Sequence, residues 1–165
     1  MRKIRVRELD RDAFDVYGSY QQLINPKTEK IGAAPIEFFR DMLQLNLGSV
    51  PTASISVCRV RRRPFVIDTV EYHDGSSEGI LPLDGDVIIH LAPATPPGQI
   101  PLDRFEAFRV PAGTFVALRP GVWHHAAYAV KREVVNVLIV LPERAYALDC
   151  EASKLPEKDQ IEIET

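Results

Sequence analysis

The stretch Glu71–Glu78, EYHDGSSE, and its continuation Pro82–Gly85, PLDG, decide how the rest of the chain is interpreted. Two glutamates and one histidine stand close together at the start of a hydrophobic run. A second imidazole pair, His124 and His125, follows some fifty residues downstream. Carboxylates and imidazoles are both metal ligands and proton-transfer groups, so this pattern indicates a metal site or an acid–base site.

Around this stretch the chain is a series of short β-prone runs separated by glycine, proline and aspartate. The predicted strands are Ala53–Val60, Phe65–Tyr72, Glu78–Leu83, Asp86–Leu91, Phe105–Val110, Thr114–Leu118, Val122–Tyr128 and Val134–Leu141. Short strands with frequent turns are typical of a β-sandwich or barrel. Asp84–Gly85 stands between two of the runs and predicts a hairpin, because a type I′ turn needs the positive φ that these residue types tolerate.

The flanking segments predict less regular structure. Glu8–Tyr17 has the apolar spacing of a helix, with Asp10 as its N-cap and Gly18 as its end. The remainder of residues 1–49 is expected to be loop, apart from the segment 35–47, whose pattern fits a helix or a strand. Residues 150–165 are expected to form a tail with little to bury. The prediction is therefore a single all-β domain over residues 1–165, with its barrel core at about 50–142.

Composition excludes several classes of partner. The net charge is −3, and the longest run of like charge is Arg61–Arg63, which is not the basic excess of a nucleic-acid-binding protein. No apolar segment is long enough to span a bilayer, and the first residues are charged, so a cytoplasmic protein is expected. Cys58 and Cys150 lack a CxxC spacing and are expected to be buried thiols rather than a disulfide or a zinc clip.

Alternation along a strand turns Glu71 and His73 to the same face, which in a small barrel is the interior. The arrangement Glu71-x-His73-x4-Glu78-x6-Gly85, followed by Pro120–His124 (PGVWH), resembles the two sequence motifs of the cupin superfamily. The first motif of that superfamily supplies two histidines and a glutamate, and here Glu71 stands in the place of the first histidine. The resemblance implies a jelly-roll (double-stranded β-helix) barrel with a short N-terminal helix.

The resemblance narrows to the ureidoglycolate lyase family. It rests on Phe14-x-x-Tyr17-Gly18, on Ser54–Arg59, on the Glu71 motif with Pro82–Gly85, and on Val122–His125. Those enzymes often carry a glutamine where this chain has Glu78. The resemblance implies a metal-dependent carbon–nitrogen lyase that cleaves a small ureido or hydroxy acid such as ureidoglycolate into glyoxylate and urea.

The residues predict a divalent metal bound by His73, Glu78 and His124, with Glu71 as a fourth ligand or a general base. Such a mixed nitrogen and oxygen set suits manganese, iron, nickel or zinc about equally, and the resemblance points to nickel or manganese. Of the adjacent imidazoles, alternation allows only one to face inward, and His124 is favoured.

Other side chains are assigned to the substrate. Arg59, on a strand expected to line the barrel, is the candidate for clamping a substrate carboxylate. Lys131 or His125 is the candidate proton donor to the departing nitrogen. His90 is expected to be a core residue.

One alternative stays open at this point. The same fold could serve a sugar or sugar-acid isomerase, or a cupin that binds a small molecule without reacting. In either case the expected partner is a small molecule, with a second copy of the chain in a homodimer.

Overall fold

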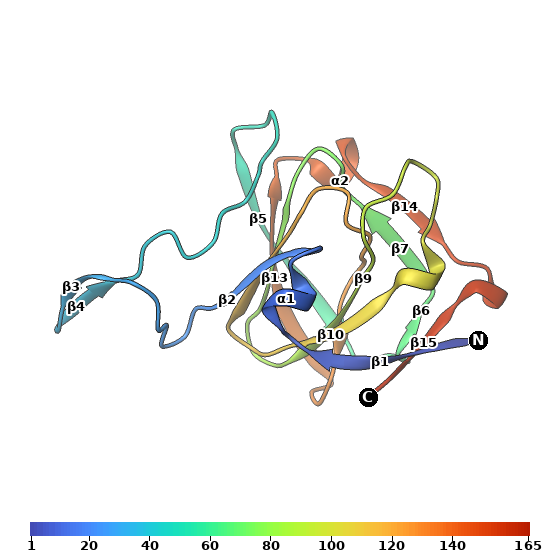
Figure 1. The fold of residues 1–165 in the computed structure, drawn as a ribbon, viewed down its shortest axis with the longest axis horizontal. Coiled ribbons are helices and arrows are strands. Elements are labelled where there is room, and N and C mark those ends of the chain that lie inside the picture. Colours follow the sequence, from blue (N-terminus) through green and yellow to red (C-terminus); the bar gives the residue numbers. More distant parts are fainter.

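The computed structural model describes residues 1–165 and consists of two β-sheets that face each other, with a projecting arm (Figure 1). One sheet has the strand order β12-β9-β10-β1-β15-β6, built from β1 (Arg2–Glu8), β6 (Val66–Ile67), β9 (Val87–Leu91), β10 (Glu106–Val110), β12 (Tyr128–Ala129) and β15 (Ile161–Glu164). The other has the order β2-β11-β8-β13-β5, built from β2 (Gly18–Gln22), β5 (Ala53–Arg61), β8 (Glu78–Pro82), β11 (Thr114–Leu118) and β13 (Val134–Pro142).

The remaining elements are short. Two further strand pairs join β7 (Thr69–Tyr72) to β14 (Glu151–Lys154), and β3 (Ile31–Ala33) to β4 (Ile36–Phe38). The helices are α1 (Arg11–Phe14), α2 (Ala145–Leu148) and two 3₁₀ turns, Leu102–Arg104 and Glu157–Asp159. None of these helices is of a length and apolarity that could cross a membrane.

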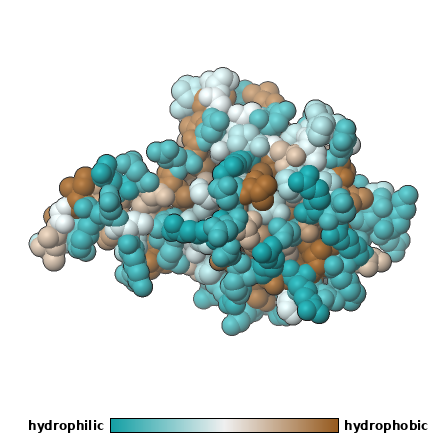
Figure 2. Space-filling model, in the orientation of Figure 1, coloured by the Kyte–Doolittle hydropathy of each residue, from teal (hydrophilic) through white to brown (hydrophobic).

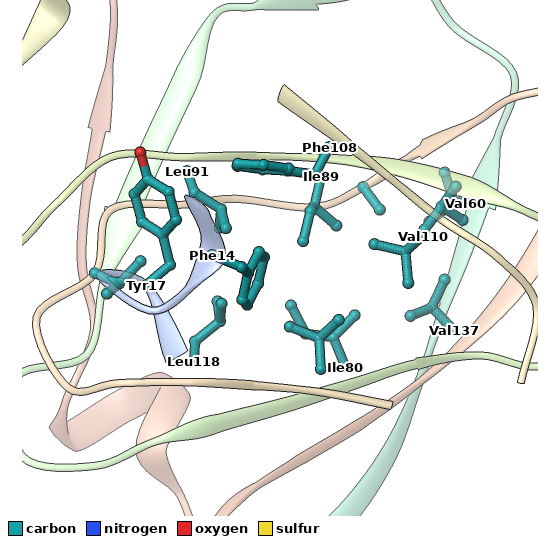
Figure 3. Close-up of a cluster of buried hydrophobic side chains, with 14 of the residues drawn as sticks. Phe14, Tyr17, Val60, Ile80, Ile89, Leu91, Phe108, Val110, Leu118 and Val137 are labelled. Atoms are coloured by element: carbon teal, nitrogen blue, oxygen red, sulfur yellow. The ribbon is translucent and has the colours of Figure 1, made fainter. Parts of the chain in front are cut away.

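The main hydrophobic core fills the space between the two sheets (Figure 3). Phe14 of α1 lies at its centre and packs edge-to-face on Phe108 of β10. Leu91 and Ile89 approach from the six-stranded sheet, and Ile80 and others approach from the five-stranded sheet. The predicted N-terminal helix therefore exists, but it is a single turn, and Phe14 at its end packs into the core. Asp10 is its N-cap, as predicted, and accepts from the Ala13 amide at 3.0 Å.

A second core covers the other face of the six-stranded sheet. Strand β9 is buried on both faces, which explains its nearly unbroken apolar run. Leu155, Ile161 and Ile163 are all buried in this second core. The expectation that residues 150–165 form a tail with little to bury is wrong, because β14 pairs with β7 and β15 pairs in parallel with β1.

Three other expectations are corrected. Residues 1–49 contain strands β1, β2 and β3 where loop or helix end was expected, whereas β4 lies in the segment 35–47, for which helix and strand were both left open. Asp84–Gly85 does not close a hairpin, because β8 and β9 belong to different sheets, and Gly85 is not among the glycines with positive φ. The run Val122–Tyr128 is largely irregular and makes only isolated bridges at Trp123 and His124 before the two-residue strand β12.

The β3–β4 hairpin projects from the body as an arm (Figure 1). Its side chains Ile31, Ile36 and Phe38 are exposed, and apolar colour gathers at the end of the arm in the space-filling view (Figure 2). Exposed apolar side chains in such numbers are common at contacts between chains. The homodimer nevertheless stays a prediction, as does the cytoplasmic location.

Candidate metal centre and its cavity

A cavity of about 200 Å³ lies in the barrel and is lined in part by Glu71, His73 and Glu78. Its walls come from strands β5, β8 and β13, from residues 125–127, and from the segment 146–150 that follows β13. Drug-sized ligand pockets usually occupy roughly 300–1,000 Å³. The cavity is therefore of the size expected for a small metabolite.

Glu78 lies between two imidazoles at the inner end of the cavity. It is the first residue of β8, and its side chain is buried. One carboxylate oxygen, Oε2, lies 2.8 Å from His124 Nε2 and 3.1 Å from His73 Nε2. Both histidines are themselves buried. The three residues predicted from the sequence to be ligands therefore converge on one point.

The second nitrogen of each imidazole is held by a backbone carbonyl. His124 Nδ1 donates to Val122 O at 2.8 Å, and His73 Nδ1 donates to Asp149 O. A carbonyl oxygen only accepts, so both Nδ1 atoms carry hydrogen, and the Nε2 atoms of the neutral rings present lone pairs.

Lone pairs aimed at a carboxylate oxygen need a positive charge between or upon them. Either the imidazoles are protonated or a cation is shared among the three groups. Metal-bound histidines usually donate a hydrogen bond from their other ring nitrogen to a carbonyl or carboxylate, and here both donate to a backbone carbonyl. Two ligands at about 2.1 Å from one ion lie roughly 3 Å apart, which the nitrogen–oxygen separations match. The donor set therefore fits a divalent metal.

Glu71, on strand β7, places a second carboxylate near the same two imidazoles. One donor atom each from Glu71, His73 and His124 lies within 4.8 Å of the other two, an arrangement that could hold a metal ion. The backbone of Glu71 exchanges two hydrogen bonds with that of His124, at 2.6 and 2.8 Å, which holds β7 against the irregular segment. Glu71 is only half-buried and also lines the cavity, so its carboxylate is within reach of both metal and ligand.

The charges of the cluster are strongly coupled. Burial by itself would raise the pKa of the Glu78 carboxyl, but the two imidazoles outweigh it and hold the pKa well below its usual range. Burial would likewise lower the pKa of His124, but the Glu78 carboxylate outweighs it and raises that pKa. Without a metal, protons on the imidazoles would balance the carboxylate, and a bound metal would replace them.

Asp149 ties the segment after α2 to the loop between the two site carboxylates. Its backbone carbonyl accepts from His73, as described above. Its carboxylate accepts from the amides of Asp74 and Gly75 at 3.0 and 3.1 Å and from the Ser76 hydroxyl at 3.0 Å. Sequence reasoning did not single out Asp149, because it lies more than seventy residues from the motif and in no regular pattern.

The two cysteines also lie at the cavity, where sequence reasoning expected only buried thiols. Both are free and half-buried. The Cys150 thiol donates a hydrogen bond to Glu71 Oε2, with Sγ 3.6 Å from that oxygen. Burial, and then the Glu71 carboxylate, raise the pKa of Cys150 to about 11, so the thiol stays protonated at neutral pH. Tyr146 of α2 stands at the rim of the cavity and is mostly exposed.

Two of the residues assigned to the substrate are not brought to the cavity. Arg59 was expected to face the interior, but its side chain is exposed, because in β5 the inward positions are those of Cys58 and Val60. Lys131 is exposed in the turn before β13, close to Asp86 rather than to the cavity. No lysine or arginine lines the cavity.

The remaining histidines are placed clearly. His125 lines the cavity although His124 contacts Glu78, so both imidazoles of the pair reach the site. The expectation that only one could do so assumed a regular strand, and this segment is irregular. His90 is a core residue, as expected. It is fully buried beside Phe105 and Tyr128, and neither of its ring nitrogens has a hydrogen-bond partner.

Comparison with known proteins covers nearly the whole chain. Residues 1–163 match the model of a family described as ureidoglycolate lyase. A ureidoglycolate lyase of Rhodobacter capsulatus is 29% identical over 126 residues, which are 75% of this chain and 77% of that protein. One from Escherichia coli K12 is 23% identical over 159 residues, which are 95% of this chain and 97% of that protein.

Among solved structures, a dTDP sugar isomerase from Desulfovibrio desulfuricans has a TM-score of 0.50 and 16% identity, and the alignment covers 86% of this chain and 87% of the other. An oxalate decarboxylase has a TM-score of 0.43 and 16% identity over 65% of this chain, which spans only 27% of that longer chain. The predicted all-β cupin fold is confirmed by the two facing sheets together with the similarity to the sugar isomerase.

Proposed function

Because the chain belongs to the ureidoglycolate lyase family, we propose that it is a metal-dependent lyase that cleaves ureidoglycolate into glyoxylate and urea. The observation that carries the proposal is that His73 and His124 both lie close to Glu78 and to Glu71, beside a cavity of metabolite size. Nickel or manganese is the proposed metal.

The positions of the residues around the cavity suggest which of them bind the metal and which face the substrate. His73, His124 and Glu78 would hold the metal, with Glu71 completing the set on the side open to the ligand. A divalent metal bound there would act as a Lewis acid toward the carboxylate and hydroxyl oxygens of the substrate. No lysine or arginine lines the cavity, so no cationic side chain would offset the repulsion between an anionic substrate and the carboxylates of Glu71 and Glu78. Binding of the substrate is therefore expected to require the metal.

The reaction needs one proton to move from oxygen to nitrogen. As the hydroxyl proton leaves, its electron pair forms the aldehyde carbonyl, the carbon–nitrogen bond breaks, and the nitrogen receives a proton to give urea. His125 lines the cavity beside Glu71 and is the proposed carrier of that proton. Lys131, the other candidate from the sequence, is not proposed, because it lies away from the cavity.

The test couples metal content to product formation. The purified protein is loaded with manganese or nickel, its metal is measured by elemental analysis, and ureidoglycolate is added while glyoxylate and urea are assayed. His73→Ala is expected to lose both metal and glyoxylate release while keeping the far-ultraviolet circular dichroism of the parent. Glu143→Ala, which removes an exposed carboxylate after β13, serves as the matched control.

Two outcomes would contradict the proposal. A His73→Ala protein that retains both metal and activity would show that the ligand set is wrong. A metal-loaded parent protein that releases no glyoxylate would exclude the lyase activity and leave a cupin that binds a small molecule or carries out a different reaction.

A further inference from the structure

The cavity has two walls of different chemistry. One wall is polar and carries Glu71, His73, Glu78 and His125. An apolar wall next to it is formed by the inward side chains of the neighbouring strands β8, β13 and β5, which are Ile80, Val137, Ile139, Leu141, Cys58 and Val60. Strand register places them together: Ile139 lies opposite Ile80, and Val137 lies opposite Cys58. The apolar wall is thus a continuous surface across three adjacent strands.

The apolar wall offers a ligand almost no hydrogen bonds. Strand β13 pairs with β8 on one side and with β5 on the other, so its backbone amides and carbonyls are used within the sheet. Cys58 is the one polar side chain on this wall, and burial raises the pKa of its thiol, which therefore stays a neutral, weak donor. Each buried polar group left without a partner costs roughly 1–3 kcal/mol. An unsubstituted ureido group placed against this wall would leave its N–H groups and its carbonyl without hydrogen-bond partners.

We propose that the preferred substrate is a small 2-hydroxy acid whose end remote from the carboxylate is a branched aliphatic group. The carboxylate and hydroxyl lie at the polar wall, and the aliphatic group lies against Ile80, Val137 and Ile139. The inference rests on the proposed function and refines it. In a lyase of this kind the apolar group would be an alkyl substituent on the distal nitrogen of ureidoglycolate, and the products would be glyoxylate and an alkylurea.

Two probes of equal shape separate the alternatives by binding alone. 2-Hydroxy-4-methylpentanoate presents an isobutyl group, and malate 4-monoamide presents a primary amide in the same positions. Binding of each to the metal-loaded protein is measured by isothermal titration calorimetry, with glycolate as the reference. Each buried methylene contributes about 0.8 kcal/mol, or roughly fourfold in affinity. The aliphatic probe is expected to bind at least about 50-fold more tightly than glycolate and at least about tenfold more tightly than the amide.

A variant pair locates the effect on the wall. Ile139→Asn places an amide among the aliphatic side chains and is expected to weaken the aliphatic probe about tenfold while leaving the amide probe unchanged or tighter. Val57→Asn is the control, because Val57 lies on the outer face of the adjacent strand β5 and is exposed. It is expected to change neither affinity.

The amide probe binding as tightly as the aliphatic one, or neither probe binding, would overturn the inference. Turnover of unsubstituted ureidoglycolate in either of those cases would leave the proposed lyase function standing. Absence of turnover on both ureidoglycolate and its derivative with an isopropyl group on the distal nitrogen, with tight binding of the aliphatic probe, would remove the lyase function and keep the recognition of an aliphatic hydroxy acid.

Discussion

Asp149 offers the sharpest test of how the site is held together. Replacing it with alanine removes three hydrogen bonds, those from the amides of Asp74 and Gly75 and from the hydroxyl of Ser76. The carbonyl that accepts from His73 belongs to the backbone and remains. The substitution therefore loosens the loop between Glu71 and Glu78 without touching any proposed ligand.

The magnitude follows from these contacts. A hydrogen bond contributes about 1 kcal/mol net, and one to a charged acceptor somewhat more. Asp149 is half-buried, so solvent recovers part of the loss. Asp149→Ala is expected to lower the free energy of unfolding by about 2–3 kcal/mol. Because Asp149 supports the backbone that orients His73, metal affinity should fall by about 10- to 100-fold.

Asp149→Asn refines the measurement. The asparagine oxygen can still accept from the amides of Asp74 and Gly75, which both contact Oδ1 of Asp149. Only the charge and the acceptor for Ser76 are lost. The expected loss of stability is therefore about 1 kcal/mol.

Urea denaturation of the metal-free proteins and metal titration of the folded ones supply the two readouts. Asp74→Ala is the matched control, since it removes an exposed carboxylate from the same loop and should change stability by less than about 0.5 kcal/mol. An Asp149→Ala protein with parental stability and metal affinity, or an Asp74→Ala protein that is destabilised equally, would contradict the role given to the Asp149 carboxylate.

Three further predictions concern the barrel itself. Hydrogen bonds from Arg109 and from the Asn136 backbone lower the pKa values of Asp86 and Asp84, respectively, so the stability they contribute is present above the ordinary pKa of 3.8 and is lost as the pH falls through the lower folded values. Acid titration of stability should show this, and the double variant Asp84→Asn, Asp86→Asn should flatten the profile; an unchanged acid limb would contradict it. His90 buries two unpartnered nitrogens, so His90→Leu should raise the free energy of unfolding by about 1–2 kcal/mol in urea; a loss of stability would count against the orphaned nitrogens. Gly18 packs so closely on β11 that an added Cβ would lie 2.0 Å from a backbone oxygen, and Gly18→Ala should therefore cost about 3 kcal/mol or more, measured by thermal unfolding; a parental melting temperature would disprove that closeness.

The ligand cluster was predictable because its members are close in sequence or follow a turn. Glu71, His73 and Glu78 lie within eight residues, and alternation along a strand brings the first two to one face. His124 was found from the proline and glycine before it. These spacings are short, so they are set by the local backbone and do not depend on contacts between distant segments.

The residues that were misplaced or missed from the sequence depend on which face of a strand a side chain occupies, or on contacts between distant segments. Arg59 and Cys58 are neighbours, and only the register of β5 against β13 decides which of them faces the cavity. Asp149 and Cys150 reach the site from the segment after α2, which has no periodic pattern. Ile161 and Ile163 alternate with glutamates over too few residues to indicate a strand, yet they complete the second core.

The parallel pairing of β1 with β15 has a consequence for how the protein is made. Arg2 pairs with Ile161 and Ile4 with Ile163, so strands at opposite ends of the sequence are neighbours in the sheet. During synthesis β1 leaves the ribosome before both of its partners, so one edge stays uncovered until β10 is made and the other until β15 is made. An uncovered strand edge is a template for pairing with other chains. The side chains of Arg2, Lys3, Arg5 and Arg7 give β1 the positive charge that strand edges of natural proteins carry against such pairing. We therefore expect these charges to oppose aggregation of the chain until β10 and β15 have formed.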